Sequence, residues 1–173
     1  MYVFTCLFFV FGRFIDEYCK QHGKYHCLNE AEQKTKYVHD YRQSCREQFK
    51  QRFRCKLFAV DIANTGTDIT SLPEFQQADV IHLHWINQGM LSLNTIRKIL
   101  TSGKPVVWTM HDMWPCTGIC HYARECRNYE QECHHCPYIY GGGGKKDLST
   151  RIFRKKKEIY SQAPITFVGC RRW

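Results

Sequence analysis

Histidine side chains stand at the ends of two apolar segments of the chain. His82 and His84 belong to the first segment, and His111 follows the second, with Asp112 directly after it. An imidazole can donate a hydrogen bond to a substrate hydroxyl or phosphate, or accept a proton, near neutral pH. A single histidine is more often structural, but three of them beside a carboxylate predict a binding or catalytic site.

A second group of reactive residues lies in a Cys-rich loop over residues 116–144. Its cysteines have the spacing C-x5-C-x6-C-x2-C, with three histidines nearby, and they are Cys120, Cys126, Cys133 and Cys136, beside His121, His134 and His135. Four thiolates can close a tetrahedral zinc site and stiffen a segment that has little apolar content. Such a zinc would be structural, because the four cysteines would occupy all four of its coordination positions. The alternative is a loop of reduced, unligated thiols.

The chain around the histidines predicts a strand, a helix and a second strand. Residues 79–85 and 106–110 have the composition of buried strands. Between them, Ser92 is a typical N-cap for an amphipathic helix over 93–100, which Gly103 ends. A βαβ unit has parallel strands, so both strand ends reach one edge of the sheet, where open α/β sheets bind ligands. Side chains two apart on a strand share a face, as the first two histidines do.

Further elements extend this pattern. Asp147 is positioned to cap a second helix, over 148–160, and 165–168 predicts another strand. Residues 57–60 predict a short strand, and Pro73 is accepted in the first turn of a brief helix. We therefore expect an α/β fold, a Rossmann-like parallel sheet with flanking helices that carries the Cys-rich loop.

The first 56 residues form a poorly defined N-terminal region. Residues 2–11 are apolar and predict either a buried strand or contact with a membrane surface, because the run is too short to span a bilayer. From Asn29 to Lys56, apolar residues recur at steps of three and four among charged ones, which predicts one long amphipathic helix. The Rossmann-like domain then covers residues 57–173.

Composition narrows the classes of partner. The chain of 173 residues has a net charge of +9, which favours anionic partners. It has eleven cysteines and no recognisable secretory signal, so we expect a reducing cytoplasm. The basic face of the helix over 148–160 favours either solvent or peripheral contact with the inner face of the plasma membrane. The chain has no G-x-G-x-x-G, Walker loop or nucleophile elbow, which argues against dinucleotide oxidoreductases, NTPases and α/β-hydrolases.

Two other interpretations stay open. Trp85 and Trp114 can offer flat apolar surfaces to sugar rings, or they can belong to the core.

A zinc-stapled basic module that binds nucleic acid without enzymatic activity is an alternative function. Against it, the basic residues spread over several predicted helices and no zinc-finger, RRM or KH signature is present, so we do not expect nucleic acid as a partner. A degenerate remnant without activity is the third reading.

Long ordered strings carry a resemblance to a known family. They are 78–87 (ADVIHLHWIN), 104–115 (KPVVWTMHDMWP), 117–118, 120–122, 147–149, 155–157 and 165–168. These strings resemble bacterial family 4 glycosyltransferases that build surface polysaccharides and exopolysaccharides, including the colanic-acid type. The resemblance implies a GT-B architecture, in which two Rossmann-like domains bind the acceptor and the nucleotide-sugar donor across a cleft. It also implies retention of anomeric configuration and no metal in catalysis.

The resemblance further implies roles for individual residues. His111 contacts the donor sugar and Asp112 orients its loop, so these two are the expected catalytic residues. The acceptor is a saccharide or a lipid-linked saccharide. The expected substrate-binding residues are His82, His84, Trp85, Asn87 and Trp114. The cysteine cluster is similar to a structural one in this subfamily.

Several positions depart from the family pattern. Residues 1–28 show neither the opening strand nor its glycine-rich loop, and Cys116 and Ile119 stand where an aromatic residue and a glycine are expected. The donor-binding domain has no counterpart before the chain stops at Trp173. We therefore expect a fragment of a retaining glycosyltransferase that is inactive alone. Half a cleft neither excludes water nor holds the donor diphosphate.

Overall fold

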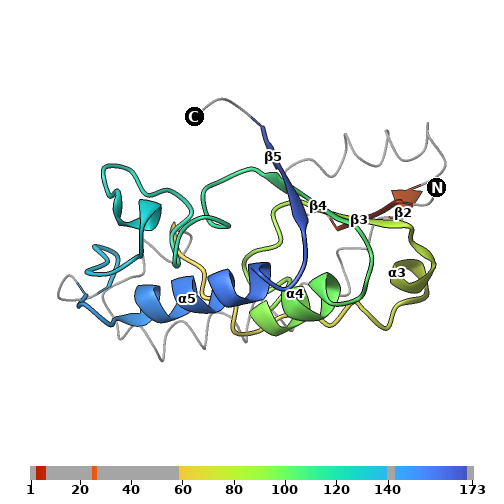
Figure 1. Cartoon of the computed structure of the whole chain (residues 1–173), viewed down its shortest axis with the longest axis horizontal. Coiled ribbons are helices and arrows are strands. Elements are labelled where there is room, and N and C mark those ends of the chain that lie inside the picture. Colours follow the sequence, from red (N-terminus) through yellow and green to blue (C-terminus); the bar gives the residue numbers. More distant parts are fainter. Residues whose placement is uncertain (1–2, 7–24, 27–58, 140–142, 171–173) are drawn as a thin grey trace.

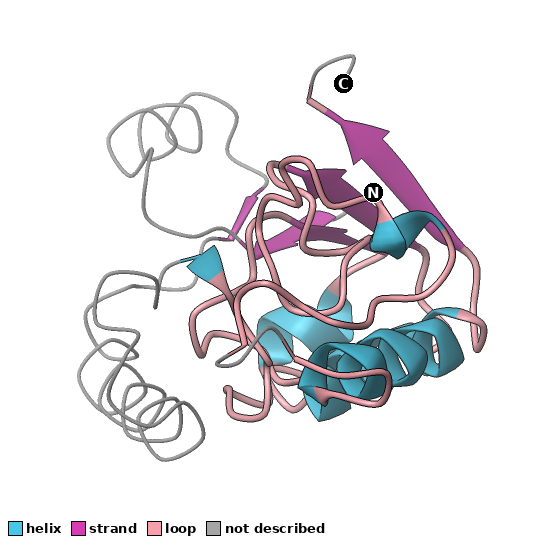
Figure 2. Ribbon diagram, turned by 90° about the vertical axis from the view of Figure 1, so that its left-hand side faces the viewer, coloured by secondary structure: helices cyan, strands magenta, loops and turns pink. Residues whose placement is uncertain are grey.

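The fold is an open parallel sheet with helices packed against it. The computed structural model describes residues 3–6, 25–26, 59–139 and 143–170. Five parallel strands form one sheet in the order β2-β1-β3-β4-β5. The elements are β1 (Val3–Cys6), β2 (Tyr25–His26), α3 (Pro73–Gln77), β3 (Val80–Leu83), α4 (Leu93–Leu100), β4 (Val106–Met110), the short 3-10 helix η2 (Asn128–Glu130), α5 (Leu148–Tyr160) and β5 (Ile165–Gly169). Helices α4 and α5 lie side by side along one face of the sheet (Figures 1 and 2). This confirms the predicted α/β, Rossmann-like class.

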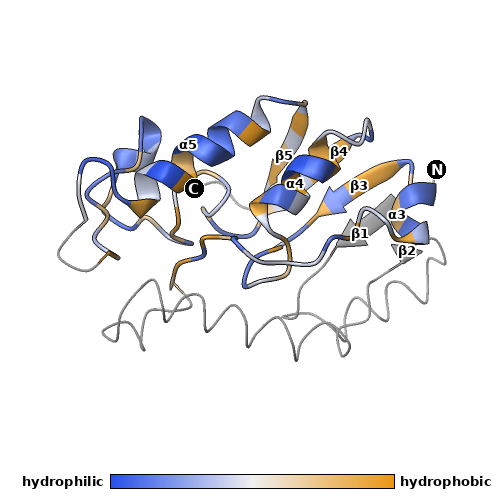
Figure 3. Ribbon diagram, turned by 90° about the horizontal axis from the view of Figure 1, so that it is seen from below, coloured by the Kyte–Doolittle hydropathy of each residue, from blue (hydrophilic) through white to orange (hydrophobic). Residues whose placement is uncertain are grey.

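Strands β3 and β4 form the centre of the described core. Ile81 and Leu83 are fully buried and pair in register with Val106 and Trp108, which are also buried. Because side chains alternate along a strand, these residues point into the same layer of the core. Both strands stand out as hydrophobic in Figure 3. The strands predicted from composition are therefore present, within about two residues of the expected ends.

Helix α4 begins and ends as its sequence predicts. The Ser92 hydroxyl accepts a hydrogen bond from the Thr95 backbone N–H at 3.0 Å, which satisfies a donor that the first turn leaves unpaired. Ile96 and Ile99, one turn apart, are fully buried against the sheet. After the helix, Gly103 has a φ of 79°, a left-handed conformation that glycine adopts without steric cost.

Helix α5 and strand β5 complete the second α/β unit. Asp147 caps α5 by accepting a hydrogen bond from the Thr150 backbone N–H at 3.1 Å, as predicted. The Tyr160 ring meets the edge of Trp108, with ring centroids 5.8 Å apart, and so anchors the end of the helix to the core. Strand β5 is the outer strand of the sheet, and it leaves Phe167 and Val168 substantially exposed.

The N-terminal part of the chain corrects two expectations. Val3–Cys6 forms strand β1 inside the sheet, between β2 and β3, so the first 28 residues do supply a strand. Residues 57–60 do not form the predicted strand in the part that is described. Val60 makes an isolated antiparallel bridge with Cys120, while 57–58 lie outside the described residues. The predicted amphipathic helix over 29–56 lies outside them as well, and so does the proposed domain boundary after residue 56.

Residues 111–139 and 143–147 form long irregular segments between β4 and α5, and η2 interrupts the first of them. A second, smaller hydrophobic cluster lies beneath them, composed of Val60, Ile62, Ile119, Cys120, Ala123 and Cys136. Among the helices of the described residues, none has the length and apolar character needed to cross a bilayer.

Candidate functional site

Three imidazoles meet at the carboxyl ends of β3 and β4, and we call His82, His84 and His111 the histidine rim. His84 Nδ1 lies 2.9 Å from His111 Nε2, and the ring centroids of His82 and His84 are 4.1 Å apart. His82 Nε2 lies 2.8 Å from the Thr109 hydroxyl on the neighbouring strand. The structure therefore brings together the three histidines that the sequence singles out. His111 is exposed and the other two are partly buried.

Two members of the rim, His82 and His84, lie in surroundings that favour a neutral imidazole. Burial, and to a smaller extent the charges of the neighbouring His82 and His111, lower the pKa of His84 to about 4. Burial also lowers the pKa of His82. Near pH 7 a neutral ring has one N–H donor and one acceptor nitrogen, so in the contact between His84 and His111 one ring donates and the other accepts. Such rings can donate to hydroxyl groups or accept a proton. The Cys170 thiol also lies 3.6 Å from His111 Nδ1.

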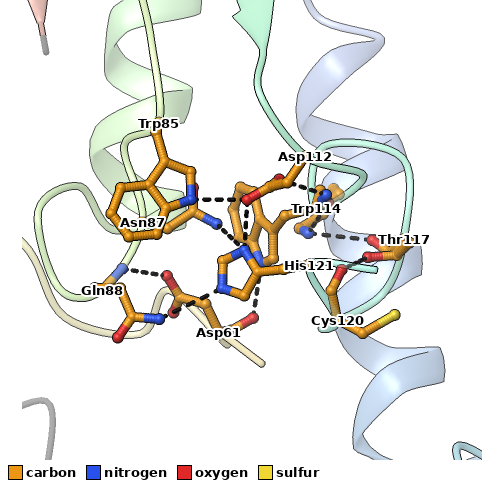
Figure 4. A network of polar contacts seen from close by, with 10 residues as sticks. Asp61, Trp85, Asn87, Gln88, Asp112, Trp114, Thr117, Cys120 and His121 are labelled. Atoms are coloured by element: carbon orange, nitrogen blue, oxygen red, sulfur yellow. Dashed lines mark hydrogen bonds and ion pairs between the residues drawn. The ribbon is translucent and has the colours of Figure 1, made fainter. Parts of the chain in front are cut away.

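Asp112 ties together the loops that follow β3 and β4 (Figure 4). Its side chain is buried, and it accepts hydrogen bonds from the Trp114 backbone N–H at 2.8 Å and the Trp85 indole N–H at 2.7 Å. Its second oxygen also lies 2.6 Å from His121 Nδ1. Because Asp112 directly follows His111, these contacts fix the backbone that presents the rim. Its position agrees with a role in orienting the loop rather than with direct contact to a ligand.

Other buried polar groups continue this arrangement, which we call the Asp112 network. Asp61 accepts from the backbone N–H groups of Ala63 and Gln88, both at 2.7 Å, and burial raises its pKa. His121 contacts the side-chain amides of Asn87 at 3.3 Å and Gln88 at 3.4 Å. The members of the network are Asp61, Trp85, Asn87, Gln88, Asp112, Trp114 and His121. Sequence reasoning missed Asp61, Gln88 and the role of His121, because no local spacing connects them.

Trp114 lies in the hydrophobic core, not at the rim. Its indole N–H donates to the Asp61 carbonyl at 2.7 Å, and its side chain is 1% exposed. The ammonium of Lys156 lies 3.2 Å from the centre of the Trp114 ring and donates to the carbonyls of Trp114 and Thr117 at 2.7 and 3.1 Å. Burial lowers the pKa of Lys156 to about 7, although Asp61 opposes this. The structure thus corrects the expectation that Trp114 contacts substrate. Its ring is buried, so neither face is accessible to a sugar.

Of the remaining predicted substrate contacts, Trp85 is partly buried and Asn87 is 3% exposed. Both are members of the Asp112 network, and in Figure 4 their side chains point toward Asp112 and His121, respectively. They support the rim from behind, through Asp112 and His121.

Four of the five cysteines of the Cys-rich loop, Cys120, Cys126, Cys133 and Cys136, line one small pocket, which we call the thiol pocket. Cys120, Cys133 and Cys136 are buried, Cys126 is partly buried, and all four are free thiols. Within the described residues, no group of three or more His, Cys, Asp and Glu side chains is positioned to hold a metal ion as it stands. The predicted juxtaposition of the cysteines is therefore present, while metal binding stays a prediction.

Comparison with known proteins gives one distant relative. A segment of the chain is 26% identical over 98 residues to a protein of Escherichia coli (strain K12) named as a glycosyl transferase of colanic acid biosynthesis, WcaC. The match covers 53% of this chain and 24% of that protein, so it spans about a quarter of the relative's length. No protein-family model and no solved structure matches the chain. This similarity supports a distant glycosyltransferase relationship.

Proposed function

We propose that this chain forms the acceptor-side wall of the sugar-transfer cleft in a retaining family 4 glycosyltransferase of the GT-B type. In this proposal the enzyme moves a sugar from a nucleotide-sugar donor to a saccharide or lipid-linked acceptor in polysaccharide biosynthesis. The observation that carries it is the histidine rim, because adjacent parallel strands deliver three imidazoles to the edge where open α/β sheets bind ligands. The distant similarity to a glycosyl transferase supports the same class of reaction.

The exposure of each histidine in the rim suggests whether it contacts the donor sugar or the acceptor. His111 is exposed and lies at the outer end of the group, so it is the residue that contacts the donor sugar. His84 and His82 are partly buried behind it and donate to, or accept from, hydroxyl groups of the acceptor. Asp112 is buried and acts as a positioning residue through its contacts with Trp85 and His121. Neutral imidazoles suit hydroxyl groups, because they offer both a donor and an acceptor.

The proposal also includes a surface for contact with the membrane that would carry a lipid-linked acceptor. The outer face of α5 exposes Arg151, Lys155 and Lys157, and Figure 3 shows this face as hydrophilic. A basic helix face is attracted to anionic lipid headgroups, at about 1 kcal/mol per Lys or Arg near the surface. Peripheral contact with the inner face of the plasma membrane, from the cytoplasm, would bring the rim near lipid-linked acceptors.

Saccharide binding tests the proposal on the chain itself. We expect lipid-linked and free oligosaccharides to shift the side-chain NMR signals of His84 and His111. Removal of one hydrogen bond costs about 1 kcal/mol, so His84→Ala and His111→Ala should each weaken binding by about fivefold. The matched control is His135→Asn, a histidine in the Cys-rich loop whose φ of 43° asparagine tolerates.

The outcome that contradicts the proposal is equally specific. Saccharides that leave the histidine signals unchanged, with salt-sensitive binding of nucleic acid instead, would support the basic-module alternative. In an enzyme that joins this domain to a nucleotide-sugar-binding domain, His111→Ala should lower turnover by about tenfold or more, and unchanged turnover would remove the assignment of His111.

A further inference from the structure

The thiol pocket holds four sulfurs in a segment with little regular secondary structure, which the smaller hydrophobic cluster and the Asp112 network also support. It lies between residues 117–120 and 133–138, two stretches with little regular secondary structure. Three of its four cysteines are buried. Segments that bury little apolar surface often gain their stability from a bound metal. Four sulfurs line the pocket, with the His134 imidazole beside them, and a donor set dominated by thiolates selects zinc or an iron–sulfur cluster.

Backbone N–H groups point at two of these sulfurs. The Gly118 N–H donates to Cys133 Sγ at 3.1 Å, and the Tyr138 backbone N–H is hydrogen-bonded to Cys136. A thiol is a weak acceptor, whereas the negative sulfur of a metal-bound thiolate is a strong one. Gly118 is required for this approach, because a Cβ at this position would lie 2.5 Å from the Ser149 carbonyl oxygen. These two N–H groups therefore lie where they would stabilise the thiolates of a bound metal.

A buried basic side chain lies close to two of the cysteines. The buried Lys156 ammonium donates to the Thr117 carbonyl, next to Gly118, and interacts electrostatically with Cys120 and Cys133. Four thiolates around a divalent cation have a net charge of −2, and burying that charge requires compensation. Lys156 and the two backbone N–H groups supply part of it.

We propose that Cys120, Cys126, Cys133 and Cys136 bind one zinc ion as a closed structural site. On binding, four S–H bonds break, four Zn–S bonds form, and four protons pass to solvent. As described, the thiols line the pocket without surrounding one point, so binding draws the loop inward around the metal. The proposal is independent of the sugar-transfer function, because no residue of the histidine rim takes part in it.

Metal analysis of the whole chain, purified under reducing conditions, tests the proposal. We expect about one equivalent of zinc per chain, lost in the variants Cys133→Ser and Cys136→Ser. The matched controls are Cys116→Ser and Cys170→Ser, since both thiols are exposed and neither lines the pocket. These controls should retain the metal.

Two measurements on the unsubstituted chain keep the test decisive if the variants fail to fold. Cobalt(II) should replace zinc and give the intense visible absorption of tetrahedral thiolate coordination, and metal binding should release about four protons. A chain that takes up neither zinc nor cobalt overturns the proposal. So does zinc that persists in the double variant Cys133→Ser, Cys136→Ser, or iron with the spectrum of an iron–sulfur cluster. Saccharide binding is measured separately, so failure of one proposal leaves the other standing.

Discussion

The βαβ unit over residues 80–110 and the irregular segments over residues 111–139 and 143–147 are stabilised by different forces. In the first, side chains such as Ile81 and Ile96 are fully buried among other apolar residues. In the second, buried polar groups such as Asp112 and Lys156 hold the backbone through directed hydrogen bonds. Hydrophobic burial is non-directional and tolerates small shifts, while hydrogen bonds fix position at the cost of desolvation.

The histidine rim lies at the border of these two regions. His84 is the first residue after β3, and His111 is the first residue after β4. The strands set the height and spacing of the imidazoles, and the Asp112 network sets the path of the loop behind them. A site at such a border combines a rigid scaffold with a loop that sequence change can reshape.

The largest effect should come from the apolar region. Ile96→Ala removes a fully buried side chain from α4 and should lower the free energy of unfolding by about 2 to 5 kcal/mol, measured by urea denaturation. The control is Asn94→Ala, an exposed position on the same helix, where a change within about 0.5 kcal/mol is expected. Equal effects of the two substitutions would mean that α4 does not carry the core.

A smaller effect should follow from the polar region. Lys156→Met keeps most of the side-chain volume but removes the donor to the Trp114 and Thr117 carbonyls, so the free energy of unfolding should fall by about 1 to 3 kcal/mol. Hydrogen exchange should localise the loss to residues 112–121. Lys157→Met, its exposed neighbour, serves as the control. A stabilised Lys156→Met variant would show that apolar packing, not the ammonium, holds this segment.

The smallest effect should be a dependence of stability on pH at the border. The folded-state pKa of His84 is about 4, below its ordinary value of 6.5, so the unfolded chain binds the proton more readily. The stability that depends on the neutral ring is therefore present above pH 6.5 and is lost as the pH falls toward 4. Unfolding curves of the wild type and of His84→Gln should diverge at neutral pH and converge on acidification. Parallel curves would place His84 in solvent, and His135→Asn gives the reference for an exposed histidine.

Sequence reasoning succeeded where the structure depends on local patterns. The strands, the caps at Ser92 and Asp147, and the meeting of the histidines all follow from periodicity and from the geometry of parallel strands. Strand β1 was only one of two alternatives predicted for residues 2–11, because a short apolar run has no period of its own and its partner β3 lies far along the chain.

The Asp112 network was beyond local reasoning for a different reason. Several of its hydrogen bonds join residues far apart in the sequence, such as Trp85 and Asp112, which are 27 positions apart, and no spacing rule predicts them. Lys156 did leave a signal that was overlooked. It lies between Ile152 and Ile159 on one face of α5, at helical spacing, although its basic neighbours suggested a solvated face. Its position on the apolar face of the helix predicts a buried side chain.

The position of β1 within the sheet affects how the chain is made. Val3 pairs with Tyr25 on one side and with Val80 on the other, so the edge of β1 that faces β3 stays unpaired until residues much further along the chain are translated. Contacts so distant in sequence form slowly, and an unpaired strand can associate with other nascent chains in the meantime. We therefore expect the yield of folded protein to depend on translation speed and on chaperones more than on the stability of the finished fold.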